Sequence, residues 1–318
     1  MNDVTDPSRT PDFLNHDRPP VPDLVVSRAV QPFHLEDRPV RGRLVRLGPL
    51  AEALLSRHDY APDVGRLLAQ ALALGAGLAA ALKFRGSFSV QAKGDGPISM
   101  LVVDCTDGGE LRGYARVAED APAAEGGARA LLGSGYLAFT CDQGLEMDRY
   151  QGIVPIEGET LAAMTDTYFR TSEQLDAWVR LAAEQTPGGW RASALILERV
   201  AGEGGFNALA EEEGDEAWRT ATILAGTLKD EELLDDALPS EQLLHRLFHQ
   251  EDLRLDRARA LSYGCRCSRA RLASVLQRFP ADDLDHMAED GAITMNCEFC
   301  NVAFHFDRAD VRSGAGRA

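Results

Sequence analysis

The chain has 318 residues, which is enough for about two domains. It carries 50 aspartates and glutamates against 33 lysines and arginines, a formal net charge of −17. A chain this acidic lacks a broad basic face for phosphate groups, which argues against nucleic acids and anionic membranes as partners.

The N-terminal residues show no secretory signal. Met1–Pro22 is rich in proline, aspartate and arginine and has no apolar run, so residues 1–23 are predicted to be a disordered tail. The longest apolar stretch, Leu67–Leu82, has 16 residues, fewer than the ~20 that a membrane span requires. We therefore expect a cytoplasmic protein, in which closely spaced cysteines more often bind metals or act in redox chemistry than form permanent disulfides.

Residues 24–202 are predicted to form an α+β core domain of mixed sheet and helices. Alternating apolar residues and the turns between them predict strands at 40–47, 87–93, 98–104, 111–117, 135–141 and 149–154. The segments 174–183 and 190–200 flank a Pro-Gly-Gly turn and are predicted to form a hairpin.

Two helices are predicted among these strands. Arg66–Phe84 is rich in alanine and leucine and is apolar nearly all round, so it is expected to be buried. Its glycines, Gly75 and Gly77, lower the helix propensity and allow another element to approach closely. The second helix is expected to begin after Thr160, which can cap it, and to run to about Arg170.

Residues 203–262 are predicted to form an acidic helical linker. Between Glu211 and Arg257 the sequence has fourteen acidic and five basic residues, a net charge of −9. Apolar residues recur there at helical spacing, which predicts two amphipathic helices joined by Asp235–Pro239. The first stripe consists of Trp218, Thr222, Ala225 and Leu228, and the second consists of Leu243, Leu244, Leu247 and Phe248. Such stripes must lie against another apolar surface.

Four of the six cysteines lie in the C-terminal segment, residues 263–312: Cys265, Cys267, Cys297 and Cys300. About fifty residues are few for an independent core, and domains of this size often need a metal or disulfides. Two short-spaced pairs of thiols fit the ligand set of a tetrahedral zinc site, which is most often purely structural.

Two details favour a site that also acts as a thiol switch. A C-x-C pair is unusual in zinc ribbons, and each pair is close enough in sequence to form a local disulfide, although the one-residue spacer strains the first. Arg266, which lies between Cys265 and Cys267, favours the thiolate form. On spacing alone, the structural site and the switch both remain open.

The other candidate ligands and nucleophiles are isolated: Cys105, Cys141, His245, His249, His286 and His305. The two cysteines fall in predicted strands, where they are expected to act as small buried hydrophobes. His286 and His305 can substitute for a cysteine ligand, and the pair His245 and His249 is expected to lie on an ordinary helix surface. The sequence has no Walker A, G-x-G-x-x-G, H-E-x-x-H or G-x-S-x-G motif, so neither an ATP site nor an enzyme is indicated.

The C-terminal pattern resembles that of a known family. Cys265-Arg266-Cys267-Ser268, a spacer ending in Ala288–Gly291, and Cys297-Glu298-Phe299-Cys300 followed by Phe304 and Phe306 are similar to the C-terminus of the bacterial redox-regulated 33 kDa chaperonin (33 kDa heat shock protein) family. Further matching stretches occur in order along the chain: Val40–Gly42, Leu82–Phe84, Gln91–Pro97, Arg149–Gly152, Glu157–Ala162 and Tyr168–Gln174. The resemblance covers about residues 30–312.

The resemblance implies an ATP-independent holdase rather than an enzyme. In its reduced, inactive form the protein would bind one zinc ion per chain through Cys265, Cys267, Cys297 and Cys300. Oxidation would form the disulfides Cys265–Cys267 and Cys297–Cys300, release the zinc and unfold the C-terminal domain and linker. The active form would be a homodimer that binds unfolding client proteins.

The second linker stripe, Leu243, Leu244, Leu247 and Phe248, is a candidate client-binding face. We expect it to be held between the core domain and the zinc domain and to become exposed on oxidation. Two alternatives stay open: a constitutive zinc-ribbon interaction module that is indifferent to oxidants, and a thiol oxidoreductase that uses Cys297 and Cys300.

Overall fold

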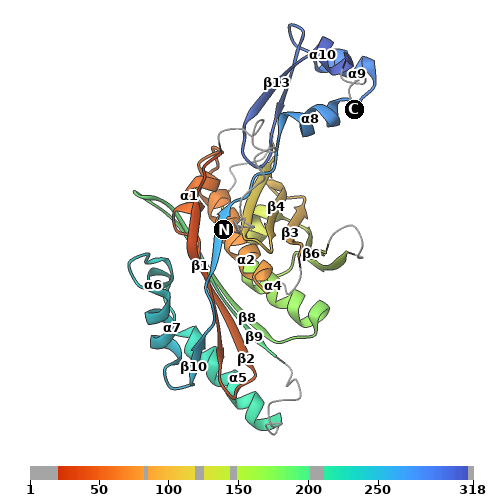
Figure 1. Ribbon diagram of the computed structural model, residues 1–318. Coiled ribbons are helices and arrows are strands. Elements are labelled where there is room, and N and C mark those ends of the chain that lie inside the picture. The colour runs from red at the N-terminus through yellow and green to blue at the C-terminus, as the bar shows by residue number, and fades with distance from the viewer. Residues whose placement is uncertain (1–20, 82–84, 119–124, 144–148, 201–210, 314–318) are drawn as a thin grey trace. The chain divides into compact units, whose positions relative to one another are not determined.

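The computed structural model describes residues 21–81, 85–118, 125–143, 149–200 and 211–313 (Figure 1). Most of the predicted N-terminal tail and the matching stretch Leu82–Phe84 lie outside the described residues. Two compact units divide the chain, a larger one from Leu24 to Gly264 and a smaller one that begins at Cys265. The boundary between the units therefore immediately precedes the first cysteine of the C-x-C pair.

The larger unit is built on one mixed sheet, in which eleven strands fall within the described residues. The order is β7-β6-β3-β4-β5-β11-β1-β2-β9-β8, with β10 also paired to β1, and all pairings are antiparallel except that of β5 with β11. The strands are β1 Val25–Leu35, β2 Val40–Arg46, β3 Ser87–Gly94, β4 Ile98–Thr106, β5 Glu110–Val117, β6 Gly135–Asp142, β7 Tyr150–Pro155, β8 Ala177–Thr186, β9 Gly189–Arg199, β10 Leu253–Leu255 and β11 Arg259–Tyr263.

Three of these strands do not appear in the sequence-based prediction, which places the first strand at residue 40. The missed strand β1 contains Pro32, which has no N–H to donate and is unusual inside a sheet. Strand β1 changes partner around this residue, from β11 at Val25–Val30 to β10 at Phe33–Leu35. The remaining missed strands, β10 and β11, are short, and their hydrogen-bond partners are the distant strands β1 and β5.

The buried helix is confirmed as α2, Pro62–Ala79, which begins earlier than predicted because Pro62 suits the first turn of a helix. Its glycines provide the expected close approach. A Cβ atom on Gly75 would lie 2.6 Å from Cγ1 of Val103, and one on Gly77 would lie 2.6 Å from Cδ1 of Ile196. Helix α2 therefore packs directly onto one face of the sheet.

Shorter helices complete the larger unit: α1 Pro49–Leu55, α3 Ala128–Leu132, α4 Leu161–Tyr168 with the π-helical turn η2 Phe169–Glu173, α5 Glu211–Gly226, α6 Asp230–Leu234 and α7 Ser240–Phe248. The hydroxyl of Thr160 accepts a hydrogen bond from the Ala163 N–H, which confirms the predicted cap of α4.

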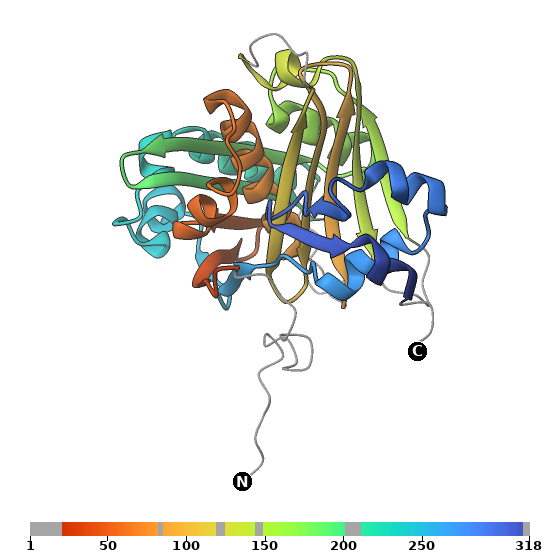
Figure 2. The ribbon, with the colours of Figure 1, turned by 90° about the horizontal axis from the view of Figure 1, so that it is seen from above.

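The described part of the predicted linker, residues 211–262, belongs to the larger unit. It forms three helices rather than two, because α6 interrupts the segment between the predicted stripes, and it then enters the sheet as β10 and β11. Helices α5 to α7, coloured cyan, lie together beside strands β8 and β9 (Figure 2). We call α5, α6 and α7 the linker helices.

The smaller unit has three helices and one hairpin within the described residues: α8 Arg269–Leu276, α9 Ala281–Met287, α10 Arg308–Ser313, β12 Ala292–Asn296 and β13 Ala303–Asp307. Strands β12 and β13 pair along their full length. A two-stranded hairpin is marginally stable by itself in water. The few buried apolar residues around it are Leu276, Leu284, Ile293, Phe304, Phe306 and Val311.

Candidate metal centre

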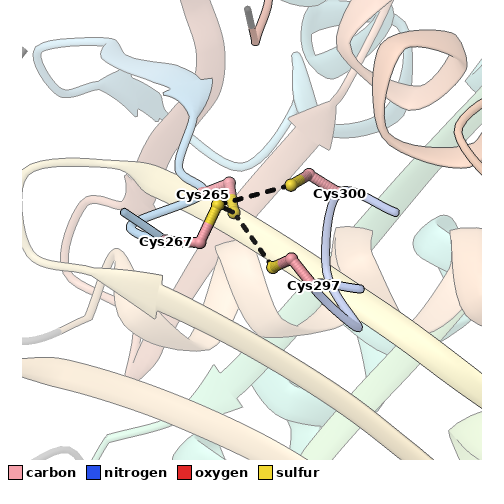
Figure 3. A group of neighbouring side chains, drawn as sticks. All are labelled: Cys265, Cys267, Cys297 and Cys300. Carbon is pink, nitrogen blue, oxygen red and sulfur yellow. Dashed lines mark hydrogen bonds between the residues drawn. The ribbon is translucent and has the colours of Figure 1, made fainter. Parts of the chain in front are cut away.

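The four cysteines of the C-terminal segment form one buried cluster, here called the thiol cluster (Figure 3). The sulfur of Cys265 lies 3.4 Å from that of Cys267 and 3.7 Å from that of Cys297. The sulfurs of Cys267 and Cys300 are 3.5 Å apart. All four sulfurs lie within 4.8 Å of one another, and the residues are between 1% and 8% exposed.

Local backbone structure places each pair of thiols. Cys265 and Cys267 precede α8, which starts at a cap formed by the Ser268 hydroxyl and the Arg271 N–H. Cys297 and Cys300 follow β12 in a tight turn closed by a 2.7 Å hydrogen bond from the Asn301 N–H to the Cys297 carbonyl. Asn301 has a φ of 54°, a left-handed conformation that asparagine tolerates better than most residues. The chain therefore returns into β13 directly after the second pair.

The geometry of the thiol cluster fits a tetrahedral metal ion. Four sulfurs bound ~2.3 Å from one ion would lie roughly 3.8 Å from each other, close to the sulfur–sulfur distances observed. A set of four thiolates is soft, which suits zinc or iron–sulfur chemistry and does not suit calcium or magnesium. The cluster can therefore hold a metal ion, and its donors are consistent with zinc.

Hydrogen bonds among the thiols change their acidity in opposite directions. The hydrogen bond with Cys267 lowers the pKa of Cys265 to about 7, and the hydrogen bond with Cys265 lowers the pKa of Cys297. Hydrogen bonds with Cys265 raise the pKa of Cys267 and that of Cys300. The cluster thus contains thiolate near neutral pH, and thiolate is the form that binds metals and reacts with oxidants.

The other two cysteines are buried in the sheet of the larger unit, as predicted. Cys105 on β4 and Cys141 on β6 both pair with Phe88 of the intervening strand β3. Two strand spacings separate them by about 9.5 Å, which is beyond the reach of a disulfide. Burial raises the pKa of the Cys141 thiol, so this side chain is less reactive than a free cysteine.

The four candidate histidines lie outside the thiol cluster. His305 Nδ1 is 2.9 Å from the Thr294 hydroxyl, and His286 Nδ1 is 2.6 Å from the Asp282 carbonyl oxygen. His245 and His249 stack with ring centroids 5.5 Å apart on an exposed side of α7. Within the described ranges, the cysteines are the only set of three or more ligating residues that could share one ion.

The linker stripe Leu243, Leu244, Leu247 and Phe248 is fully covered, with each residue at most 3% exposed. It packs on the sheet of the larger unit in a cluster that includes Leu44, Leu195 and Leu197. The rings of Phe248 and Phe33 lie 5.5 Å apart, and Gly42 leaves the space that the Phe33 ring occupies over β2. The stripe thus conceals an apolar face of the sheet.

Sequence reasoning missed a set of arginines that bind the linker helices to this sheet: Arg46, Arg180, Arg191 and Arg199. Arg46 lies on β2, Arg180 lies on β8, and Arg191 and Arg199 lie on β9, all on one face of the sheet. The period of two along each strand was the available signal. Their partners are acidic residues and carbonyl groups of the linker, which only the folded chain identifies.

Among the helices that the structure describes, none has the length and apolar character needed to cross a lipid bilayer.

Fold and site together define a class: an α+β unit whose apolar sheet face is covered by acidic helices, joined to a small unit built on four clustered thiols. The family model described as Hsp33 protein matches residues 29–307. The chain therefore belongs to the Hsp33 family, a family of chaperonins.

Individual relatives agree with this assignment. The 33 kDa chaperonin of Caulobacter vibrioides is 42% identical over 294 residues, covering 89% of this chain and 96% of the relative. The 33 kDa chaperonin of Pseudomonas fluorescens is 36% identical over 299 residues, covering 92% and 96%. The crystal structure of the 33 kDa chaperonin of Thermotoga maritima has the same fold, with a TM-score of 0.73, 20% identity and coverage of 90% and 97%.

Proposed function

We propose that this protein is a cytoplasmic, ATP-independent holdase whose chaperone activity is switched on by oxidation. The thiol cluster is the observation that carries the proposal, because four buried sulfurs at tetrahedral spacing can bind zinc when reduced and can pair when oxidised. Membership of a chaperonin family supports the chaperone part. Its partners would be unfolding client proteins and, in the active form, a second copy of the chain.

In the reduced form, Cys265, Cys267, Cys297 and Cys300 would be the zinc ligands, one ion per chain. Zinc bound there would tie the segment before α8 to the turn after β12 and contribute about 10–16 kcal/mol, as in other small zinc domains. Whole domains are stable by only about 5–15 kcal/mol. With so few apolar residues buried, the smaller unit would depend on these four ligands.

Oxidation would convert each pair of ligands into a disulfide. Two thiolates give up two electrons to one peroxide molecule, which takes up two protons and leaves as two water molecules while the sulfur–sulfur bond forms. We expect Cys265 to pair with Cys267 and Cys297 to pair with Cys300. Cross pairings are also near in the folded cluster, but once the unit opens only the local pairs stay close.

Sulfurs in disulfides are no longer thiolate ligands, so the smaller unit would lose its main source of stability. The two disulfides close very short loops and restore little, because short loops constrain the unfolded chain weakly. The linker would then loosen, and Leu243, Leu244, Leu247 and Phe248, with the sheet face beneath them, would become available to clients.

The direct test measures suppression of client aggregation before and after treatment with peroxide or hypochlorous acid, together with zinc content and free thiols. We expect one zinc and four protected thiols at first, and afterwards no zinc, two disulfides and strong suppression. Equal suppression in both states would reject the switch and favour a constitutive zinc module. Catalytic reduction of insulin by Cys297 and Cys300 would instead indicate an oxidoreductase.

A further inference from the structure

One face of the strands β1, β2, β9 and β8 combines an apolar centre with a rim of arginines. Across strands β2, β9 and β8, Leu44 lies opposite Leu195, which lies opposite Arg180. In the same way Arg46 lies opposite Ser193, which lies opposite Ala182. These six side chains therefore share one face of the sheet. We call it the linker-covered face. Its apolar members are Phe33, Leu35, Val40, Leu44, Leu195 and Leu197, and its arginines are Arg46, Arg180, Arg191 and Arg199.

Each arginine of this rim binds the acidic linker. Arg180 Nε lies 2.9 Å from Asp230, Arg191 Nε lies 2.5 Å from Asp236, and Arg199 lies 2.6 Å from Asp215. The three ion pairs come from three separate parts of the linker. They surround the centre of the face, where the apolar stripe of α7 packs.

Arg46 makes a different contact. It is only 8% exposed, and it donates hydrogen bonds to the main-chain carbonyls of Glu232, at 2.7 Å, and of Leu238. The Glu232 carbonyl lies in the last turn of α6, where a helix leaves acceptors unused, and the Leu238 carbonyl lies in the segment that leads into α7. The face therefore binds main-chain carbonyls of the linker as well as its carboxylates.

The rim keeps a positive balance without the linker. Asp176 and Glu184 lie at its edge, beside Arg199 and Arg191 respectively, and oppose the four arginines. Losing the linker would leave three arginines without Asp230, Asp236 and Asp215. A basic segment docking there would place like charges together, whereas an acidic segment would restore the pairs.

We infer that the linker-covered face selects client segments that resemble the linker itself: amphipathic helices with aliphatic or aromatic residues on one side and carboxylates beside them. This inference rests on the proposed function, because the face is free only when the linker leaves it. The linker helices act as an internal competitor for the same surface. A helix laid in an apolar groove is a common mode of peptide recognition.

The test uses two labelled peptides and the oxidised full-length protein. The first peptide copies residues 228–249, which include both α6 and α7. The second carries lysine in place of Asp230, Asp235, Asp236 and Glu241 and keeps every apolar residue. We expect the acidic peptide to bind about tenfold more tightly, a difference that a few rim charges can supply.

A charge-swapped chain sharpens the test. The variant R180E/D230R/R191E/D236R reverses two ion pairs but keeps them, so its linker should still dock in the reduced state. After oxidation its preference should reverse toward the lysine peptide. Arg149→Glu is the control, because Arg149 is exposed and pairs with Asp142 of β6, at the opposite end of the strand order from β8, and this variant should keep the wild-type preference.

The outcomes separate this inference from the proposed function. Equal binding of the two peptides by the oxidised wild type would overturn the inference, as would an acidic preference that survives the charge swap. Either result leaves a holdase standing if aggregation is still suppressed. Absence of suppression by the oxidised wild type would instead reject the proposed function. Should the swapped chain fail to fold, the wild-type preference alone decides.

Discussion

The larger and smaller units are stabilised in different ways. The larger unit has a conventional core, in which α2 buries leucines and alanines against the central strands and the linker helices cover the remaining face. In its described part, from Cys265 to Ser313, the smaller unit buries six apolar side chains and four thiols around a single hairpin. A core of hydrocarbon is insensitive to oxidants, whereas a core of four thiols that bind a metal ion would be dismantled by chemistry on the sulfurs.

Removal of zinc should produce the largest difference in stability between the two units. A chelator added to the reduced protein should unfold the smaller unit, because zinc bound by the four thiols would contribute more than the apolar core can replace. Amide hydrogens of β12 and β13 should then exchange at nearly the rate of an unfolded chain, while those of β3 and β4 stay protected. Hydrogen exchange read by mass spectrometry measures both at once.

Single substitutions give matched controls for that experiment. Cys265→Ser should reproduce the loss of protection in β12 and lower zinc affinity, whereas Cys105→Ala, in the sheet, should leave one zinc ion per chain. Continued protection of β12 in chelated protein would show that the smaller unit does not depend on its ligands.

A core deletion should affect only the larger unit. Leu72 is fully buried on α2, so Leu72→Ala should lower the free energy of unfolding by about 2–5 kcal/mol. All three tryptophans, Trp178, Trp190 and Trp218, belong to this unit, so tryptophan fluorescence in urea reports its unfolding.

The matched variant is Leu276→Ala, which removes an equally buried leucine from the smaller unit. It should speed zinc release and leave the tryptophan transition where it is. If Leu276→Ala shifted that transition as far as Leu72→Ala does, the two units would unfold together and the comparison would fail.

The free energy of unfolding of the larger unit should depend on pH through Asp166 on α4. Burial raises the pKa of this carboxyl group to about 6, and its Oδ1 atom is buried without a hydrogen-bond partner. Ionisation of the Asp166 carboxyl group therefore destabilises the folded state. The cost is absent below the unfolded pKa of about 4 and complete above about pH 6.

Asp166→Asn should remove this cost. Its gain in unfolding free energy over wild type should rise from near zero at pH 4 to about 1–3 kcal/mol at pH 7. The measurement is urea unfolding by tryptophan fluorescence at several pH values, with Glu216→Gln on α5 as an exposed control. A gain that does not vary with pH would show that the effect is one of packing alone.

The smallest effect is expected from a surface contact in the smaller unit. Arg269 stacks over the Phe306 ring at 4.8 Å and donates a 2.6 Å hydrogen bond to the His305 carbonyl. Arg269→Gln should weaken the unit by about 0.5–1 kcal/mol. Zinc release to a chromogenic chelator should become about two- to fivefold faster. A much larger acceleration would mean that the thiols are not the dominant support of this unit.

Particular residues show how far sequence reasoning reached. The two cysteine pairs, the buried helix with Gly75 and Gly77, and the Thr160 cap all follow from local spacing and composition, and the structure bears them out. Strand β1 was missed because Pro32 normally argues against a strand, and the residue is tolerated where β1 changes partners.

The linker shows what local sequence patterns do not specify, namely the surface against which an apolar stripe packs. Its apolar stripe was evident from helical periodicity, but the same pattern fits any apolar surface. In the structure, the larger unit supplies that surface through its sheet, and β10 and β11 join the sheet beyond the predicted boundary of the core domain. A short strand gains its hydrogen bonds only from neighbours that are distant in sequence.

By itself, the sequence determined the thiol pairs, the family and the acidic character of the linker, because each depends on residues close together in the chain. The tertiary structure confirmed that the four sulfurs converge, as the spacing predicted, and it alone decided that Phe248 packs beside Phe33. It alone set Asp230 and Asp236 against Arg180 and Arg191. Contacts of this kind form when strands and helices far apart in sequence share one face, and spacing along the chain does not specify them.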